Sequence, residues 1–194
     1  MNNDTTMRKI VLASNSPRRR ELLGGLGYDY EVRVLDGIDE SYPDTLRGSE
    51  VAAYISRAKA DAYRATMADD EIIITADTIV CLDDMVLGKP ADEAEAVAML
   101  RSLSGRTHQV YTGVTIVAAE QSSTFVSRSD VVFATLTDEE IAHYVAHYRP
   151  MDKAGAYGIQ EWIGYIGVER IDGSYFNVMG LPVQRLYTEL KKYL

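Results

Sequence analysis

The chain has 194 residues, 46% of them hydrophobic, and a formal net charge of −9 at pH 7. That length and hydrophobicity suffice to bury one compact core, so we expect a single unit with two lobes. The acidic balance argues against non-specific binding to nucleic acid or to an anionic membrane, because a phosphate backbone selects a basic surface. An anionic ligand would therefore require local positive charge within a repulsive overall field.

The sequence also bears on the compartment. Cys81 is the single cysteine and lies in an apolar stretch, so an intramolecular disulfide is impossible and a reducing compartment, the cytoplasm, is expected. The polar opening has neither the basic nor the apolar segment of a signal peptide. We expect residues 1–7 to be a disordered extension, with Met7 as an alternative start. No apolar run approaches the ~20 residues that span a bilayer, so no membrane contact is expected.

Strands and helices alternate through the first half of the chain. The expected elements are a strand over residues 9–13, a helix from Pro17 to about 24–27, a strand over 28–35, a helix over 49–67 and a strand over 72–82. Ser49 is the predicted N-cap of the second helix. An Asp83-Asp84 turn follows the last strand.

The second half continues the alternation. The expected elements are a helix over residues 92–103, antiparallel strands over 107–118 and 124–136, a helix that stops before Pro150, a hairpin of 162–171 and 174–178, and a helix from Pro182. Asp92 with Glu95, and Thr137 with Glu140, have capping-box spacing, and Gly105 ends the first of these helices. Together the elements predict an α/β fold: a mixed sheet with flanking helices.

The segment Ser14-Asn15-Ser16-Pro17-Arg18-Arg19-Arg20 predicts an anion site. It places three cations in the first turn of a helix, where the helix dipole disfavours each by roughly 0.3–1 kcal/mol. Free backbone N–H groups, serine hydroxyls and guanidinium groups together suit a phosphate chain. The alternative is a solvated basic patch at an exposed helix start. The G-x-x-x-x-G-K-[ST] pattern of a P-loop is absent.

Several charged residues outside this segment are candidates for chemistry. Asp77 lies inside an apolar strand, where a carboxylate needs a metal, hydrogen bonds or a raised pKa; the alternative is a structural aspartate. Asp39 and Glu40 offer further carboxylates, or form a solvated loop pair. Lys59 and Lys89 are candidate phosphate ligands, although each lysine taken singly is more often a surface charge.

These residue types suit phosphoryl chemistry, in which Lys, Arg and a metal neutralise charge. Oxygen ligands and a polyphosphate substrate indicate Mg²⁺ or Mn²⁺. A carboxylate would bind this divalent metal or accept a proton from the attacking water, and the residues alone leave both roles open. His143 and His147 lack the glutamate of H-E-x-x-H, so zinc is not expected. A serine hydrolase is weakly supported, because no G-x-S-x-G elbow occurs.

Five segments resemble the Maf family. They read LASNSPRRRELL at residues 12–23, ADTIV at 76–80, GKP at 88–90, LSGRTH at 103–108 and TGV at 112–114. The resemblance spans residues 8–194 and implies a single catalytic domain, with two lobes around a central cleft and a fold related to the inosine triphosphatases. It further implies a metal-dependent nucleoside triphosphate pyrophosphatase and a homodimer.

Two further segments, DKAGAYGIQ at residues 152–160 and GSYFNV at 173–178, resemble the branch that converts dTTP and UTP to monophosphate and pyrophosphate. The other main branch, active on 7-methyl-GTP and some pyrimidine nucleotides, usually has a different segment over residues 154–160. The resemblance thus implies a small-molecule nucleotide as the partner. The nucleotide is either a normal or a modified pyrimidine nucleotide.

The resemblance assigns roles to individual residues. It implies that Asp77 is the proton acceptor and that Lys59 and Lys89, the further catalytic residues, face the phosphates as Arg18 and Arg19 do. The phosphate-binding positions are Ser14, Ser16, Arg18 and Arg19, the selectivity positions are Arg18, Thr78 and Gln160, and the metal ligands are Glu40 and Asp77. Asp39 is an alternative to Glu40. A glutamine amide presents a donor and an acceptor to a base edge, while the alternative for Gln160 is satisfying loop backbone.

A second function from another class stays open. The family's historical association with septum formation implies a regulatory protein that binds nucleotides or cell-division partners. Such a protein would keep the arginine anion site but would not need Asp77 between cations. Incubation with UTP or dTTP and a divalent metal separates the two functions.

Overall fold

The computed structural model describes residues 8–194, so the extension expected at 1–7 lies outside the described residues. Within residues 8–194, seven strands form one sheet in the order β2-β1-β3-β5-β6-β7, with β4 paired to β3. The strands are β1 (Lys9–Leu12), β2 (Tyr30–Val32), β3 (Glu71–Leu82), β4 (Met85–Leu87), β5 (Thr107–Val117), β6 (Ser122–Phe133) and β7 (Val168–Asp172). The helices are α1 (Pro17–Gly24), α2 (Ser49–Arg64), α3 (Glu93–Leu103), α4 (Asp138–Tyr148), the 3₁₀ turn η1 (Ala154–Ala156), α5 (Trp162–Gly167), α6 (Tyr175–Met179) and α7 (Val183–Leu190).

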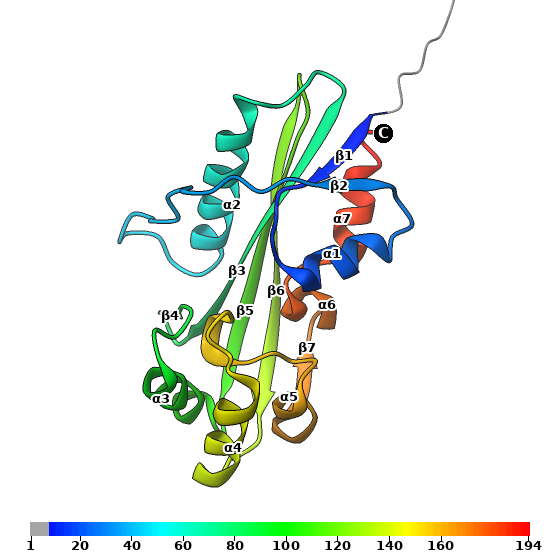
Figure 1. Cartoon of the computed structure of the whole chain (residues 1–194). Helices are drawn as coiled ribbons and strands as arrows, with labels where there is room; N and C mark the ends of the chain where they lie inside the picture. The colour runs from blue at the N-terminus through cyan, green and yellow to red at the C-terminus, as the bar shows by residue number, and fades with distance from the viewer. Residues whose placement is uncertain (1–7) are drawn as a thin grey trace, which may run out of the picture.

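The sheet is mixed. β1 pairs in parallel with β2 and β3, whereas β3, β5, β6 and β7 pair antiparallel in that order. The long strands β3, β5 and β6 run through the length of the molecule, with α1, α2 and α7 around one end and α3, α4 and α5 at the other (Figure 1). The predicted α/β class with a mixed sheet and flanking helices is confirmed. None of the helices in the described range is long and apolar enough to cross a membrane.

The alternation of side chains along β3 decides what each face of the sheet carries. Ile72 and Ile74 belong to the large core, whereas Ile73 and Ile79 pack in two smaller clusters with residues of α2. Successive side chains of a strand point to opposite faces. Asp77, two residues before Ile79, therefore faces α2.

Most of the predicted elements are confirmed, but the predicted hairpin over residues 162–178 is wrong. The chain forms α5, β7 and α6 there, and β7 pairs with β6. The side chain of Ser174 accepts a hydrogen bond from Asn177 N at 3.3 Å and caps α6. The available partner strand and this cap overrode the local strand pattern. The short strand β4, after the expected turn, was not predicted.

Two predicted helix caps differ from those in the structure. Gly48, with φ +47°, precedes α2 in place of Ser49, and its conformation is one that glycine adopts without strain. At α3, Asp92 accepts from Glu95 N, but the Glu95 carboxylate accepts from Ala91 N and so does not close the box. The predicted box of Thr137 and Glu140 at α4 is confirmed.

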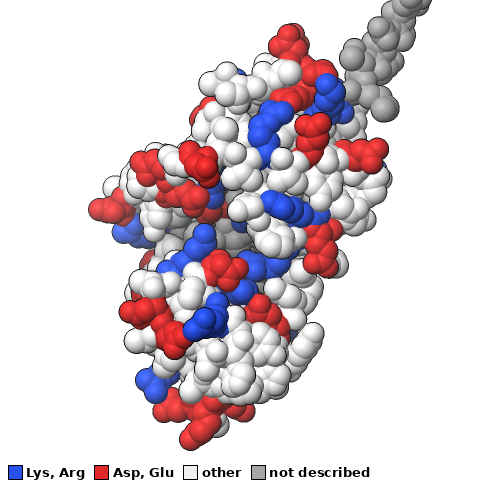
Figure 2. Space-filling model, in the orientation of Figure 1, with Lys and Arg blue, Asp and Glu red and all other residues white. Residues whose placement is uncertain are grey.

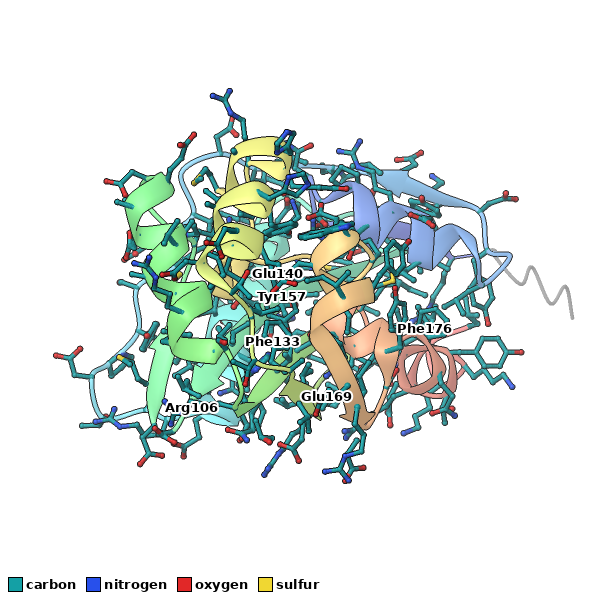
Figure 3. The ribbon with its side chains drawn as sticks, turned by 90° about the horizontal axis from the view of Figure 1, so that it is seen from below. Arg106, Phe133, Glu140, Tyr157, Glu169 and Phe176 are labelled. Atoms are coloured by element: carbon teal, nitrogen blue, oxygen red, sulfur yellow. The ribbon has the colours of Figure 1, made fainter. Side chains whose placement is uncertain are left out.

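A buried histidine lies in the core at the α4 and α5 end of the sheet. The ring of His108 packs edge-on against Phe133 and Tyr157, and its Nε2 lies 2.7 Å from the Tyr157 hydroxyl. In Figure 3, Phe133 and Tyr157 lie in the interior, whereas Arg106 and Glu169 lie toward the outside. Burial lowers the pKa of His108 to about 4, because the charged imidazolium is poorly solvated there.

Lowering the pH is expected to weaken the fold through His108. Since its folded pKa lies below the ordinary 6.5, the unfolded chain takes up the proton first, and stability is lost as the pH falls from about 6.5 to 4. His108→Phe cannot titrate. Its free energy of unfolding should therefore fall less between pH 7 and pH 5 than that of wild type, by on the order of 2 kcal/mol. Urea unfolding at both pH values measures this difference.

Glu71 does not interfere with that measurement. Its hydrogen bond with Arg33 lowers the pKa of Glu71 to about 2 from 4.5, so its contribution to stability is lost only below about pH 4.5. Equal losses of stability in wild type and His108→Phe between pH 7 and pH 5 would contradict the assignment to His108.

Candidate functional site

A cavity of about 370 Å³ opens beside the middle of β3, a size typical of small-molecule sites. Nine of the ten site residues expected from the sequence line it. The cationic and hydroxyl members are Ser16, Arg18, Arg19, Lys59, Lys89 and Thr78. The other three are Glu40, Asp77 and Gln160. Residues far apart in the sequence thus meet at one place.

The cavity is positive although the protein is acidic. Five cationic side chains and three carboxylates line it, against a net charge of −9 for the whole chain. In Figure 2, lysine and arginine side chains gather around a hollow at the middle of the molecule. This local excess of positive charge meets the requirement for attracting an anionic ligand to an acidic protein.

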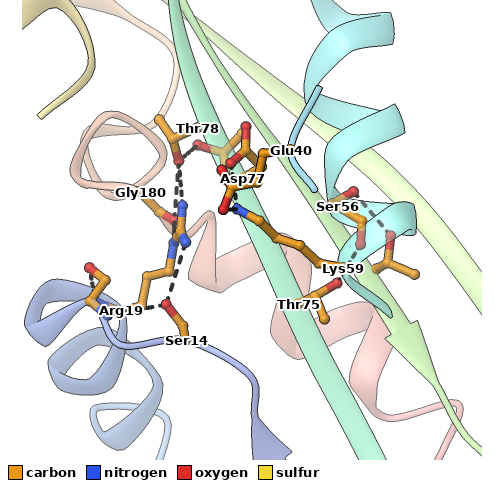
Figure 4. A network of polar contacts seen from close by, with 12 residues as sticks. Ser14, Arg19, Glu40, Ser56, Lys59, Thr75, Asp77, Thr78 and Gly180 are labelled. Carbon is orange, nitrogen blue, oxygen red and sulfur yellow. Dashed lines mark hydrogen bonds and ion pairs between the residues drawn. The ribbon is translucent and has the colours of Figure 1, made fainter. Parts of the chain in front are cut away.

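Lys59 lies between two carboxylates in the wall of the cavity (Figure 4). Its Nζ is 2.8 Å from Asp77 Oδ1 and 3.0 Å from Glu40 Oε1. The Lys59 and Asp77 side chains are 14% and 12% exposed, whereas Glu40 is 52% exposed. Asp39 instead accepts hydrogen bonds from Ser41 N and Oγ, which lower the pKa of Asp39. The geometry thus favours Glu40 over Asp39 as the second carboxylate of this cluster.

A close approach between α2 and the sheet places Lys59 over Asp77. A Cβ on Gly113 of β5 would lie 2.3 Å from the Ala52 carbonyl oxygen, so only glycine fits there. Beneath the same helix, Thr75 Oγ1 donates to the Ser56 carbonyl at 2.7 Å. These buried contacts fix the height of α2 above β3, and thereby the distance from the Lys59 ammonium to the Asp77 carboxylate.

Arg19 reaches from α1 across the cavity to β3. Its side chain donates to Gly180 O at 2.9 Å, Thr78 Oγ1 at 3.1 Å and Ser14 Oγ at 3.4 Å (Figure 4). Burial lowers the pKa of Arg19, and the negative charge of Asp77 opposes that shift, but an arginine still remains protonated. Ser14, the tenth expected residue, is not among the described residues that line the cavity. It accepts the hydrogen bond from Arg19 and so helps to orient the guanidinium.

The start of α1 has the expected form. Pro17 occupies the first turn, and the Ser16 side chain accepts a hydrogen bond from Arg19 N at 3.5 Å. Arg18 points a guanidinium toward Asp152, at 3.5 Å. The helix therefore presents Arg18 and Arg19 to the cavity from adjacent positions.

Gln160 shows an unfilled capacity for hydrogen bonding. Its Oε1 is buried and finds no donor among the described residues. A buried acceptor without a partner is rare and unfavourable, so such an atom in a cavity wall suggests that a ligand donates to it. This observation favours a ligand-facing Gln160 over one that satisfies the loop backbone.

Sequence reasoning gave no site role to several residues that line the cavity, among them Tyr42, Asp152 and Lys153. The segment containing Asp152 and Lys153 carries a family motif, but adjacent opposite charges are usual on solvated surfaces. Burial of the Lys153 side chain, which is 9% exposed, is what marks it out. No signal in the sequence singled out Tyr42.

The oxygen ligands fit a divalent metal of the magnesium type. Asp77 and Glu40 both contact the Lys59 ammonium and hence lie close to each other. Mg²⁺ is usually held by one or two carboxylates, with waters and substrate phosphates completing its shell. Within residues 8–194, no group of three or more His, Cys, Asp or Glu forms a self-sufficient metal site. Two carboxylates beside a cavity of this size fit a metal ion whose coordination is completed by water and the phosphates of the substrate.

Comparison with known proteins supports the sequence resemblance. The chain matches the family described as Maf-like protein over residues 9–193. A dTTP/UTP pyrophosphatase of Bacteroides thetaiotaomicron is 62% identical over 184 residues, covering 95% of each chain. One of Phocaeicola vulgatus is 64% identical over 184 residues, also 95% of each chain. Among solved structures, a HAM1 protein of Coxiella burnetii aligns with TM-score 0.49 and 18% identity over 96% of this chain and 100% of that chain.

Proposed function

We propose that this chain, which belongs to the Maf family, hydrolyses dTTP and UTP, or modified pyrimidine nucleotides, to the monophosphate and pyrophosphate. The observation that carries the proposal is the positive cavity in which Asp77 and Lys59 meet two arginines and the unpaired Gln160 amide oxygen. Relatives more than 60% identical are named for dTTP and UTP. We place the enzyme in the cytoplasm, as one catalytic domain with two lobes.

The cationic side chains would hold the triphosphate. Arg18, Arg19 and Lys89 come from α1 and from the segment after β4, so they approach the cavity from different elements. Phosphoryl transfer depends largely on positioning and on charge neutralisation, which such cations supply to the departing pyrophosphate. Ser16 adds a hydroxyl to this phosphate side, and Ser14 acts through Arg19.

Asp77 would accept the proton of the attacking water. Lys59 holds its carboxylate in place by an ion pair of 2.8 Å, and the α2 face of β3 directs it into the cavity. Glu40 and Asp77 would hold the divalent metal, which when bound supplies charge neutralisation at the phosphates. Water delivered to the α-phosphorus, with pyrophosphate leaving opposite, yields the nucleoside monophosphate.

Hydrolysis of UTP in H₂¹⁸O with Mg²⁺ or Mn²⁺ tests the reaction. Attack at the α-phosphorus is expected to give UMP and pyrophosphate, with the label in UMP. Mass spectrometry of both products locates the oxygen. UDP with orthophosphate, or label in pyrophosphate, would contradict the proposed position of cleavage, and no turnover with either metal would favour a protein that only binds nucleotides.

Gln160→Ala is expected to alter the choice of base more than the chemistry. Its amide would pair with the base, whereas the cations hold phosphates common to every nucleotide. A lost hydrogen bond to an uncharged base edge is worth about 0.5–1.5 kcal/mol, so relative kcat/KM should shift several-fold. The measurement is kcat/KM for dTTP, UTP, CTP and GTP at fixed metal concentration.

Lys89→Ala is the comparison for that experiment, because losing a phosphate ligand should depress all four substrates alike. A uniform loss in Gln160→Ala would make Gln160 a structural residue. The proposal also includes the homodimer that the family resemblance implies. Sedimentation equilibrium of the purified chain, whose monomer mass is 21.6 kDa, tests this point.

A further inference from the structure

We infer that Tyr144, Lys153 and Glu161 are positioning residues that set base selectivity by holding the segment from Gly158 to Gln160 against the cavity. The inference rests on the proposed function, in which the Gln160 amide reads the base. Tyr144 and Glu161 are not among the described residues that line the cavity, whereas Lys153 borders it and also pairs with Glu161. They form a buried polar network directly behind the segment that carries the amide.

Tyr144 connects the segment to the network at its first residue. Its hydroxyl accepts a hydrogen bond from Gly158 N at 3.0 Å and donates a short one to Glu161 Oε2. Burial and the Glu161 hydrogen bond raise the pKa of Tyr144, so the hydroxyl keeps its proton and remains a donor. Tyr144 is fully buried in α4, a helix closed by a complete capping box. The hydroxyl is therefore fixed to a rigid element.

Lys153 anchors the residue that follows the segment, Glu161. Its Nζ lies 3.2 Å from Glu161 Oε1 and 2.8 Å from Asp152 Oδ1, and its side chain is 9% exposed. A buried ammonium is stable only when paired, so the Lys153 charge keeps the Glu161 carboxylate in place. Both oxygens of Glu161 are thus occupied, one by Tyr144 and one by Lys153. Glu161 immediately follows Gln160 and has little freedom to turn.

The backbone of the segment packs closely against its neighbours. A Cβ on Gly158 would lie 2.9 Å from the Glu161 carboxyl carbon and 3.0 Å from Lys153 Cε. A Cβ on Gly164 of α5 would lie 1.8 Å from the Ile159 carbonyl oxygen. Ile159 is itself buried. Gln160 is the remaining member, and its buried Oε1 has no protein donor within the described residues. The close packing on both sides leaves the Gln160 amide oxygen as an unpaired buried acceptor next to the cavity that Gln160 lines.

The same network reaches the phosphate side of the cavity. Asp152 binds Lys153 through Oδ1, and its Oδ2 lies 3.5 Å from Arg18 on α1. Alternating charges therefore run from Arg18 to Glu161. This row of ion pairs connects the residues that would hold the phosphates with the segment that would bind the base. It would therefore set the distance between the phosphate site and the base site.

The test compares Tyr144→Phe with wild type for UTP and CTP. Phenylalanine keeps the buried ring but loses the hydroxyl, so Gly158 N and Glu161 each lose a partner. The ratio of kcat/KM for UTP over CTP is expected to fall about 2- to 10-fold, which is the worth of the one hydrogen bond that Gln160 would make to the base. A purely structural role would reduce the active fraction and lower both rates equally, leaving the ratio unchanged.

Tyr193→Phe is a matched control. Tyr193 is also buried, but its hydroxyl donates to Ser123 Oγ at 2.7 Å, whereas that of Tyr144 contacts Gly158 and Glu161. The loss of thermal stability should be similar in the two variants, whereas the UTP over CTP ratio should change only in Tyr144→Phe. A change of ratio in Tyr193→Phe equal to that in Tyr144→Phe would overturn the inference.

A double-mutant cycle with Gln160→Ala then tests the route of the effect. If Tyr144 acts through Gln160, the double variant should have the UTP over CTP ratio of Gln160→Ala alone; additive changes would overturn the inference. So would an unchanged ratio in Tyr144→Phe beside a changed one in Gln160→Ala. If Tyr144→Phe does not fold, Glu161→Gln replaces it, with the same expectation. Absence of UMP formation by wild type would instead reject the proposed function itself.

Discussion

Replacing Asp77 with asparagine is expected to lower kcat for UTP by about 10²–10⁴-fold, the range typical of general acid–base catalysis. Asparagine keeps the volume of the side chain, but its amide can neither accept a proton from water near neutral pH nor supply a carboxylate to a metal. Lys59 retains its contact with Glu40 at 3.0 Å, so its ammonium stays paired and the fold should persist. The measurements are kcat at saturating Mg²⁺ and the midpoint of thermal unfolding.

Asp61→Asn is the matched control for that loss. Asp61 lies on α2 with Lys59, but its side chain is 72% exposed and contacts Arg64 on the surface. It should retain wild-type turnover. Near-normal kcat in Asp77→Asn at saturating metal would remove Asp77 as the proton acceptor and as an essential ligand, and would return it to the role of a structural aspartate.

Gly113→Ala is expected to have the largest effect on stability. Its Cβ would lie 2.3 Å from the Ala52 carbonyl oxygen, well inside van der Waals contact, and that atom belongs to helix backbone. Since α2 must move away from β5, we expect a loss of about 3 kcal/mol or more, corresponding to a midpoint lowered by roughly 6–12 °C. The same movement should withdraw Lys59 from Asp77 and lower kcat in the molecules that remain folded.

Gly88→Ala is the control for the stability change. A Cβ on Gly88 meets no atom within 4 Å, and its backbone is not in the left-handed region, so its midpoint should stay close to that of wild type. A midpoint in Gly113→Ala equal to that of Gly88→Ala would show that α2 adjusts freely. The account of how Lys59 is placed would then be wrong.

Local patterns in the sequence predicted most of the helices and strands correctly. Spacing of apolar residues predicted β3 and α2, and the Thr137 and Glu140 pattern correctly predicted a capping box, because these signals act within a few residues. The prediction was wrong over residues 162–178. There the strand pattern gave way to α5 and α6, since β7 found its partner in β6 and Ser174 capped a helix.

The sequence also determined which kinds of chemistry were available. Arginines in the first turn of a helix and a carboxylate within an apolar strand are locally unfavourable, and such features suggest a ligand. A family resemblance then named individual residues. The resemblance named Glu40 but left Asp39 open, because which of the two lies 3.0 Å from Lys59 depends on how an irregular loop packs against α2.

The polar network of Tyr144, Lys153 and Glu161 beside the cavity could not be predicted from the sequence, because tertiary packing creates it. Lys153 is adjacent to Asp152 in sequence and resembles half of a solvated pair, yet it is buried and also bound to Glu161. Tyr144 and Gly158 are fourteen residues apart and meet only because α4 packs beside the segment. The free energy of a buried charge or hydroxyl depends on partners brought from elsewhere in the chain, and local spacing carries no record of them.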